Sequence, residues 1–432
     1  MNRAMKGAIV LLLACLITAG VSCGSSEEAK EIKIGVIGPM SYIQGEHHWA
    51  GAQMAAEEIN DAGGITLGGE SYQIELVQAE SNEITSPTDA VLAMERLITV
   101  DNVDFVVGGF RSESVIAMQE TAMENEMIFL GCGASDLLLC ENVATDYEKY
   151  KYWFRVTPVN GQYLTTISFM LAGMVAQDIG ALGVIPKVAI LAENNVWANP
   201  LVAAAEASFP GLGMQVVGTW RPSQMATDVT AVLTAIELAG ANMIYTAVSG
   251  PLGVAYTTTW GQMEIPAASV GINVEAQKGN FLEVTSGYGA YETTLNTYAR
   301  VEITDKTIPF YDSFVEETGE IPIYTAGTYE ALYILKAAIE SADTLDADAV
   351  VTALEATDLS GAAGRLAYMA ANTTTPHDII WGPGHVTGVG VQWQDGVLEC
   401  VWPNAEGSLG ELEYEGTVDY ILPPWVVEAL TE

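Results

Sequence analysis

A glycine-rich turn at Gly108–Glu113 has the composition of an anion-binding site. It follows a β-rich run and opens a stretch with helical periodicity. Free backbone N–H groups and the positive end of a helix favour a negative charge there, and the hydroxyl of Ser112 would add a donor to a carboxylate. Arg111 could pair with a second carboxylate of the ligand or with its neighbour Glu113, and Ser112 could simply cap its own helix. The turn therefore predicts a carboxylate site, with these alternatives open.

Three other loops carry groups suited to a small polar ligand. Gly133 lies in the loop Gly131–Asp136 after the next β-rich run, where glycine lets the backbone approach a ligand closely, although an ordinary turn would need glycine too. Trp197 could close its indole over an aliphatic or aromatic group, or it could be a core or hinge residue. Ser249 and Gly250 follow a later β-rich run and offer a further polar edge.

The histidines and carboxylates form no recognisable catalytic or metal-binding pattern. His47 and His48 have no Cys or acidic partners at ligand spacing, so they are expected on a polar surface rather than at a metal or the mouth of a cleft. His377 and His385 also lack metal spacing. The chain has no GxxxxGK, GxSxG or HExxH motif, and no GxGxxG after its first strand. The sequence therefore argues against an enzyme and predicts no metal and no cofactor.

The beginning of the chain is typical of a secretory signal. In residues 1–22, two basic residues precede an apolar run from Ala8 to Ala19, and small residues then lead to Cys23. The segment Gly20–Cys23 resembles a bacterial lipobox, with Gly20 where Leu is usual. Cys23 is therefore the predicted lipidation site, and residues 23–30 suit a flexible tether. The alternative is an ordinary signal peptide followed by an unmodified cysteine.

Charge and cysteine content limit the partners and the compartment. Without residues 1–22 the chain keeps 14 Lys and Arg against 55 Asp and Glu, a net charge of −41, which excludes nucleic acid as a partner. No later apolar stretch reaches about 18 residues, so the mature chain is expected to be soluble apart from its anchor. In an oxidising envelope Cys132 and Cys140 could form a disulfide. The alternative is that these two residues and Cys400 are free buried thiols.

The helices and strands that must position these groups are predicted to form two α/β halves. From residue 31, short β-rich runs alternate with helical periodicities, which is typical of a parallel sheet covered by helices. Ser86 and Pro87 supply an N-cap and a first-turn proline, Gly63–Gly64 ends the helix expected over 48–62, and Tyr324–Ala338 is expected to be a core helix. The predicted strands of the first half are Ile32–Ile37, Gln73–Gln78, Val103–Val107 and Met127–Leu130. After Tyr150–Pro158 the pattern restarts, with predicted strands Val188–Leu191, Met214–Thr219, Asn242–Val248 and Ala268–Gly271.

The stretch Trp49–Ile65, WAGAQMAAEEINDAGGI, resembles the first-helix signature of the branched-chain amino-acid-binding family of type I periplasmic binding proteins. Weaker segments match in the order that the family has them, namely Pro87–Val107, Phe154–Arg155, Tyr324–Ile339 and Gly361–Arg365. The resemblance implies a two-lobed Venus-flytrap fold with three crossovers and a ligand between the lobes. Lobe 1 would span 31–156 plus about 296–365, and lobe 2 would span 157–295 plus about 366–432.

The resemblance also implies roles for the loops after the strands. Ser112 would hold the carboxylate of the ligand, and Ala134 and Ser135 would hold its carboxylate and amine. Family members that bind amino acids place an acidic residue after a strand of lobe 2 where this chain has Asn273. A neutral amide does not balance a buried ammonium ion as a carboxylate does, although Glu275 could substitute if the loop is displaced. An amino acid, a simple carboxylate and an amide therefore all stay open as ligands.

Together these features favour an extracytoplasmic solute-binding lipoprotein. It would be a monomer, held at the periplasmic or outer face of the membrane by its lipid anchor alone, and would deliver a small polar ligand to the permease of an ABC importer. A ligand-sensing or regulatory lipoprotein on the same fold is the alternative, and an enzyme of unrecognised type is a more distant one.

Overall fold

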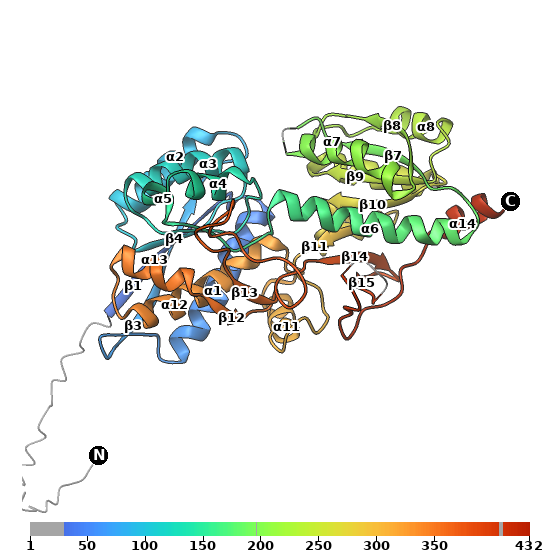
Figure 1. The fold of residues 1–432 in the computed structure, drawn as a ribbon. Helices are drawn as coiled ribbons and strands as arrows, with labels where there is room; N and C mark the ends of the chain where they lie inside the picture. Colours follow the sequence, from blue (N-terminus) through green and yellow to red (C-terminus); the bar gives the residue numbers. More distant parts are fainter. Residues whose placement is uncertain (1–29, 196, 406–408) are drawn as a thin grey trace, which may run out of the picture.

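The computed structural model describes residues 30–195, 197–405 and 409–432. Figure 1 shows two lobes side by side, with several segments of the chain running between them. The predicted signal segment, the tether and the predicted lipidation site Cys23 lie outside the described residues.

Lobe 1 is built on a six-stranded sheet in the order β2-β3-β1-β4-β5-β6. Its strands are β1 (Lys30–Gly38), β2 (Ile65–Leu67), β3 (Glu70–Glu80), β4 (Phe105–Gly108), β5 (Phe129–Gly131) and β6 (Trp153–Arg155). All neighbours pair in parallel except β2 with β3. The central strands are rich in Val, Ile and Phe and are buried on both faces, as parallel strands between helix layers must be.

Helices from two separate parts of the chain cover this sheet. They are α1 (Ile43–Asp61), α2 (Pro87–Thr99), α3 (Ser112–Glu124), α4 (Leu138–Thr145) and α5 (Tyr147–Tyr150), and later α11 (Thr307–Thr318), η3 (Tyr324–Gly327), α12 (Thr328–Ala342) and α13 (Ala347–Glu355). The cap predicted for α2 is confirmed, because the Ser86 hydroxyl accepts from the backbone N–H of Asp89 with Pro87 in the first turn. The predicted core helix is also confirmed, because α12 is largely buried against α1.

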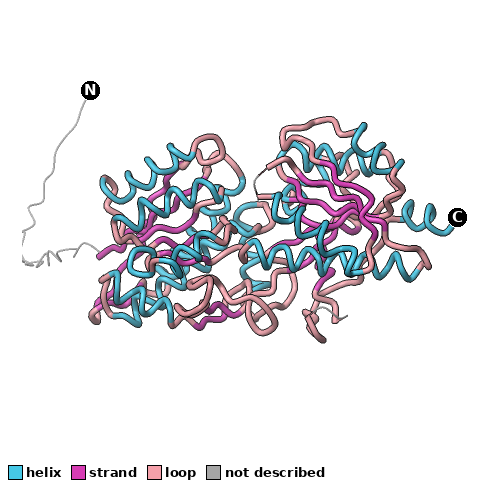
Figure 2. Tube along the Cα trace, turned by 45° about the horizontal axis from the view of Figure 1, so that its top comes forward, coloured by secondary structure: helices cyan, strands magenta, loops and turns pink. Residues whose placement is uncertain are grey.

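Lobe 2 is built on a seven-stranded sheet in the order β15-β14-β11-β10-β9-β7-β8. Its strands are β7 (Lys187–Ala192), β8 (Gln215–Trp220), β9 (Met243–Val248), β10 (Ala268–Asn273), β11 (Thr293–Asn296), β14 (Val389–Gln394) and β15 (Val397–Trp402). The helices of this lobe are α6 (Gly161–Ala181), α7 (Ala198–Ser208), η1 (Phe209–Leu212), α8 (Thr230–Leu238), α9 (Gly250–Gln262), η2 (Val274–Gln277), α10 (Phe281–Val284) and α14 (Pro424–Thr431). In Figure 2 the strands of each lobe run between layers of helices.

The two sheets share one winding pattern. The order β3-β1-β4-β5-β6 in lobe 1 corresponds to β8-β7-β9-β10-β11 in lobe 2, and all these neighbours pair in parallel. Lobe 2 adds the antiparallel hairpin β14–β15 at the edge of β11. The predicted fold class, two lobes each with a mostly parallel sheet between helices, is confirmed.

The chain passes between the lobes three times, after β6, after β11 and before β14. The three crossing segments lie together around a small void lined by residues 156–159, 295–297, 386 and 388, with Leu164 and Ile167 of α6. The Thr157 hydroxyl donates to the carbonyl of Tyr324 at 2.7 Å. This hydrogen bond therefore connects the first crossing segment to η3 of lobe 1.

Several features differ from the sequence predictions. Strands β2, β6 and β11 were not predicted. The tail after about Gly361 was expected to contain strands and loops that cross back between the lobes, without bounds for β14 and β15. A small hairpin of β12 (Asp358–Ser360) and β13 (Arg365–Ala367) lies apart from both sheets. In the described part of the chain, α6 is long and apolar enough to span a membrane. One face of α6, including Leu171 and Val175, is buried in lobe 2.

Candidate functional site

The loops after the strands of the two lobes lie close enough for their charges to interact. Burial raises the pKa of Glu193 in lobe 2, and the guanidinium of Arg111 in lobe 1 is among the groups that oppose this rise. The ammonium of Lys278 in lobe 2 likewise adds to the lowered pKa of His47 in lobe 1, which is mainly due to burial. The carboxyl ends of open parallel sheets are where such folds bind ligands, so these loops form the walls of the candidate site.

In lobe 1, the predicted anion-binding turn is partly occupied by a residue of the chain itself. One carboxylate oxygen of Glu83 accepts from the backbone N–H groups of Phe110 and Arg111 at 2.9 and 2.7 Å. The other oxygen accepts from the Ser81 hydroxyl at 2.9 Å. Burial raises the pKa of Glu83 to about 7. The prediction that these two N–H groups are free for a ligand was therefore wrong, because an internal carboxylate already binds them.

The side chains of Arg111 and Ser112 in this turn differ in their hydrogen bonding. Arg111 donates to the carboxylate of Glu113 through Nε at 3.0 Å and through Nη2 at 2.6 Å, which was one of the two alternatives for it. Ser112 is the first residue of α3, whose N-cap position is Arg111, and no side-chain hydrogen bond caps that helix. Within the described chain the Ser112 hydroxyl makes no hydrogen bond. Ser112 therefore does not cap its own helix.

Hydrogen bonds from Arg155 hold the second loop of lobe 1, Gly131–Asp136, in place. The buried guanidinium of Arg155 donates to the carbonyls of Ala134 and Asp136 and pairs with Asp378 at 2.9 Å. The carbonyl of Ser135 accepts from Gly161 N at 2.7 Å, while the Ser135 hydroxyl makes no hydrogen bond to any described residue.

Gly133 joins this loop to the neighbouring turn. A Cβ at Gly133 would lie 2.3 Å from the Gly109 carbonyl oxygen and 2.8 Å from Cα of Phe110. Only glycine permits this approach, so the two loops form one surface.

The cysteines near this loop are not bridged. Cys132, Cys140 and Cys400 are all free and buried, so the disulfide considered between Cys132 and Cys140 is not formed in this structure. Burial raises the pKa of the Cys140 thiol to about 12, and its sulfur lies 3.8 Å from Nη2 of Arg155. Cys132 and Cys140 are therefore part of the core of lobe 1, whereas Cys400 lies in the core of lobe 2.

Glu193 organises the facing wall in lobe 2, and the sequence analysis missed it. It is fully buried directly after β7. One of its oxygens accepts from the backbone N–H and the hydroxyl of Ser249, both at 2.8 Å, and the other accepts from the indole N–H of Trp197. The signal that could have found it is a carboxylate that immediately follows a buried strand. The polar groups predicted for a ligand at Ser249 are bonded to Glu193.

Asn273 and Glu275 differ in their burial and hydrogen bonds. The Asn273 side chain is fully buried and donates to Thr257 at 3.0 Å and to Glu292 at 3.1 Å. Its placement as a ligand contact is therefore corrected, since the amide faces the interior of lobe 2. Glu275 accepts from Gly250 N at 3.0 Å and pairs with Lys278 at 2.6 Å while staying partly exposed.

Aromatic side chains add an apolar element to both walls. In lobe 1, the rings of Phe110 and Tyr324 lie 6.4 Å apart and both residues are half-buried. Burial raises the pKa of Tyr324, with Glu275 of the facing lobe adding to the rise. In lobe 2, Trp197 is half-buried at the start of α7.

The predicted surface position of the two adjacent histidines was wrong. His47 and His48 are 2% and 0% exposed, and burial lowers their pKa values to about 4 and about 3. Nδ1 of His48 bonds to the Gln44 carbonyl at 2.7 Å. His377 is also buried and lies 2.9 Å from Glu355. Among the described residues, no group of His, Cys, Asp and Glu is arranged to hold a metal ion.

Comparison with known proteins agrees with this architecture. Residues 31–381 match the family model described as periplasmic binding protein. The chain is 23% identical over 409 residues to the Leu/Ile/Val-binding protein homolog 7 of Brucella abortus (strain 2308), covering 91% of this chain and 96% of that protein.

Solved structures show the same fold. A branched-chain amino acid transporter substrate binding protein from Streptococcus pneumoniae in complex with isoleucine superposes with a TM-score of 0.69 at 20% identity, covering 86% of this chain and 98% of that one. A solute binding protein of an ABC transporter from R. palustris in complex with benzoate superposes with a TM-score of 0.66 at 18% identity, covering 86% and 95%. The chain therefore belongs to the periplasmic binding protein family.

Proposed function

We propose that this protein captures a small carboxylate-bearing ligand, an amino acid in the first instance, between its two lobes and delivers it to an ABC importer. The observation that carries the proposal is the pair of hydroxyls of Ser112 and Ser135. They stand on adjacent strand-end loops of lobe 1 without hydrogen-bond partners in the described chain. A ligand carboxylate at the N-terminus of α3 would accept from such donors and gain from the helix dipole.

The facing wall supplies the opposite charge that an amino acid requires. Glu275 is a partly exposed carboxylate on a strand-end loop of lobe 2 and pairs with Lys278, so an ammonium group there would replace part of the compensation now given by Lys278. Trp197, Phe110 and Tyr324 would contact an apolar side chain on the same ligand. An α-amino acid combines these three features within one small molecule.

The ligands seen in similar proteins support the carboxylate more strongly than the amine. The proteins that superpose on this chain include one with isoleucine and one with benzoate, and these two ligands share a carboxylate. The amine therefore depends on Glu275 of this chain, and a simple carboxylate or an amide is the alternative if Glu275 does not meet a ligand.

The mechanism we propose is closure of the lobes about the three crossing segments. A ligand that contacts both walls binds the closed form more tightly and thereby shifts the population toward it. Removal of water on closure strengthens the hydrogen bonds to the rigid loops. The closed form would be read by a permease, with Cys23 holding the protein at the extracytoplasmic face of the membrane.

A thermal-shift screen of the chain from Gly24 onward tests the proposal, because a ligand that binds only the folded state raises the melting temperature. The panel contains amino acids, small carboxylates, amides and polyamines. A selective shift with apolar amino acids supports the full proposal, and a shift with carboxylates alone keeps the receptor while removing the amine. No shift with any carboxylate or amino acid would contradict the proposed function.

A further inference from the structure

A second cavity lies between the lobes, next to Lys278 of the candidate site but lined by other residues. It has a volume of about 450 Å³, which is within the usual range for a small-molecule site. One wall comes from lobe 2, and the other from α11 and the loop after it, which packs on lobe 1 through Phe314 and His47 at 4.9 Å. Its lining residues are Gly279, Asn280, Glu283, Tyr311, Gly319, Glu320, Ile321, Trp393, Gly396, Val397 and Leu398.

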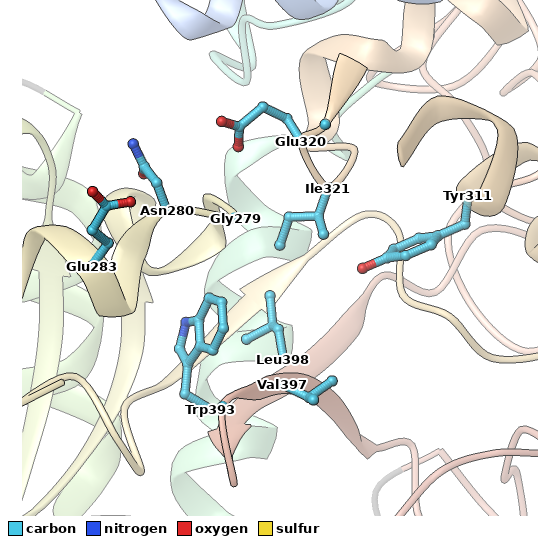
Figure 3. Close-up of a pocket in the computed structure, with 11 residues that line it drawn as sticks. Gly279, Asn280, Glu283, Tyr311, Glu320, Ile321, Trp393, Val397 and Leu398 are labelled. Atoms are coloured by element: carbon cyan, nitrogen blue, oxygen red, sulfur yellow. The ribbon is translucent and has the colours of Figure 1, made fainter. Parts of the chain in front are cut away.

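The polar rim of this cavity is acidic. Figure 3 shows the carboxylate of Glu320 turned toward the side where Asn280 and Glu283 lie. The Oε2 atom of Glu320 is buried and has no hydrogen-bond partner among the described residues. A buried carboxylate oxygen without a partner is costly, so this atom is suited to accept from a ligand.

Nearby cations of the chain do not neutralise this rim. Lys278 pairs with Glu275 at 2.6 Å, and Arg300 pairs with Asp312 through two contacts at 2.7 and 2.9 Å. Neither Glu283 nor Glu320 has an ion pair within the described chain. The rim therefore keeps two carboxylates, the half-buried Glu320 and the exposed Glu283, that no cation of the described chain neutralises.

The floor of the cavity is apolar and aromatic. Trp393 is held by a hydrogen bond from its indole N–H to the Ala276 carbonyl at 2.8 Å and is stacked on Phe281 at 6.1 Å. Val397, Leu398 and Ile321 complete the floor, and the phenol of Tyr311 points toward it (Figure 3). Burial raises the pKa of Tyr311 to about 12, so the phenol is neutral. Carboxylates above an indole favour a cation that also carries apolar groups.

We propose that this cavity is a second binding site, for a small organic cation such as an amine or a quaternary ammonium compound. The cation would contact Glu320 and Glu283, and its apolar groups would lie on Trp393 and Leu398. The site is separate from the candidate carboxylate site, because the two share no lining residue.

Isothermal titration of the mature chain with choline and with phenethylamine tests this site. Each cation is compared with its neutral counterpart, the carbon isostere of choline and phenethyl alcohol. The site predicts that at least one cation binds and that its neutral counterpart binds about tenfold more weakly or not at all. Failure of both cations to bind, or equal binding of the neutral counterparts, would overturn the proposal.

Variants locate the binding and separate it from the proposed carboxylate site. Glu320→Gln and Glu283→Gln should each weaken cation binding by about tenfold without lowering the melting temperature, whereas the matched control Glu428→Gln on the exposed face of α14 should leave cation binding unchanged. Ser112→Ala should also leave cation binding unchanged. If Ser112→Ala abolishes binding while the two glutamine variants retain it, the cation occupies the other site and the inference is wrong.

Discussion

At the scale of single residues, two buried carboxylates, Glu83 and Glu193, hold the loops of the candidate site in place. Their oxygens already accept hydrogen bonds from the chain, so these carboxylates would not contact a ligand. Glu83 holds the backbone of the turn at Phe110 and Arg111, and Glu193 holds Ser249 and Trp197. Each carboxylate fixes the loop next to a strand end. The ligand-binding groups are therefore preorganised, and the donors left for a ligand are fewer than the sequence suggested.

Ser112→Ala tests the free donor of lobe 1. The variant should weaken binding of a carboxylate ligand by roughly 1 to 3 kcal/mol, because a hydrogen bond to a charged group is lost. Its melting temperature without ligand should be unchanged, since the hydroxyl has no hydrogen bond to described residues. Titration calorimetry on both proteins measures the difference, and equal affinities would show that Ser112 does not contact the carboxylate.

Glu83→Ala tests whether the carboxylate of Glu83 positions the turn at Phe110 and Arg111. The alanine variant leaves two backbone N–H groups and the Ser81 hydroxyl without their acceptor, so it should lower the free energy of unfolding by about 1 to 3 kcal/mol and weaken ligand binding. Glu83→Gln keeps one carbonyl oxygen and should recover most of both losses. Denaturant unfolding and calorimetry distinguish these cases. A glutamine variant as impaired as the alanine variant would mean that the negative charge, not the hydrogen bonds, matters.

At the scale of elements, the positions of most parallel strands along the chain followed from the sequence, because buried runs of Val and Ile alternate with helical stretches. The bounds of the hairpin β14–β15 were not predicted, since the tail after Gly361 mixes Gly, Pro and Trp and has no clear period. The partners of the site loops were beyond sequence reasoning for another reason. Glu83 and Phe110 are 27 residues apart, and Glu193 and Ser249 are 56 apart, and no local pattern connects them.

Gly133→Ala tests the contact between the two loops of lobe 1. The added methyl would meet backbone atoms of Gly109 and Phe110, which cannot move aside as a flexible side chain can. The variant should lose about 1 to 3 kcal/mol of stability and bind ligand more weakly. Gly173→Ala is the matched control, since a Cβ there meets nothing within 4 Å in α6, and it should be neutral or slightly stabilising. Similar melting temperatures for the two variants would contradict the close approach.

Glu292→Gln tests a buried carboxyl beneath the strands β10 and β11. Burial raises the pKa of Glu292 from 4.5 to about 7, so the folded protein holds this proton more tightly than the unfolded chain does. The contribution of the group to stability is therefore full below about pH 4.5 and is lost as the pH rises through 7. Relative to the wild type, the glutamine variant should gain stability across this range, by about 3 kcal/mol at most. A difference in melting temperature that stays constant from pH 4.5 to 8 would contradict the raised pKa.

At the scale of the whole molecule, two sheets with one winding are joined by three crossing segments that lie together at one hinge. Glu83 and Glu193 bond only within their own lobes. The proposed closure would therefore bring together two walls whose loops each keep their own geometry.

The most direct test is a crystal structure of the mature chain with the carboxylate or amino acid that gives the largest thermal shift. The account predicts a ligand between the lobes, with its carboxylate about 3 Å from the hydroxyl of Ser112 or Ser135 and any ammonium group facing Glu275. A ligand bound outside the space between the lobes, or one whose carboxylate faces lobe 2, would contradict the account.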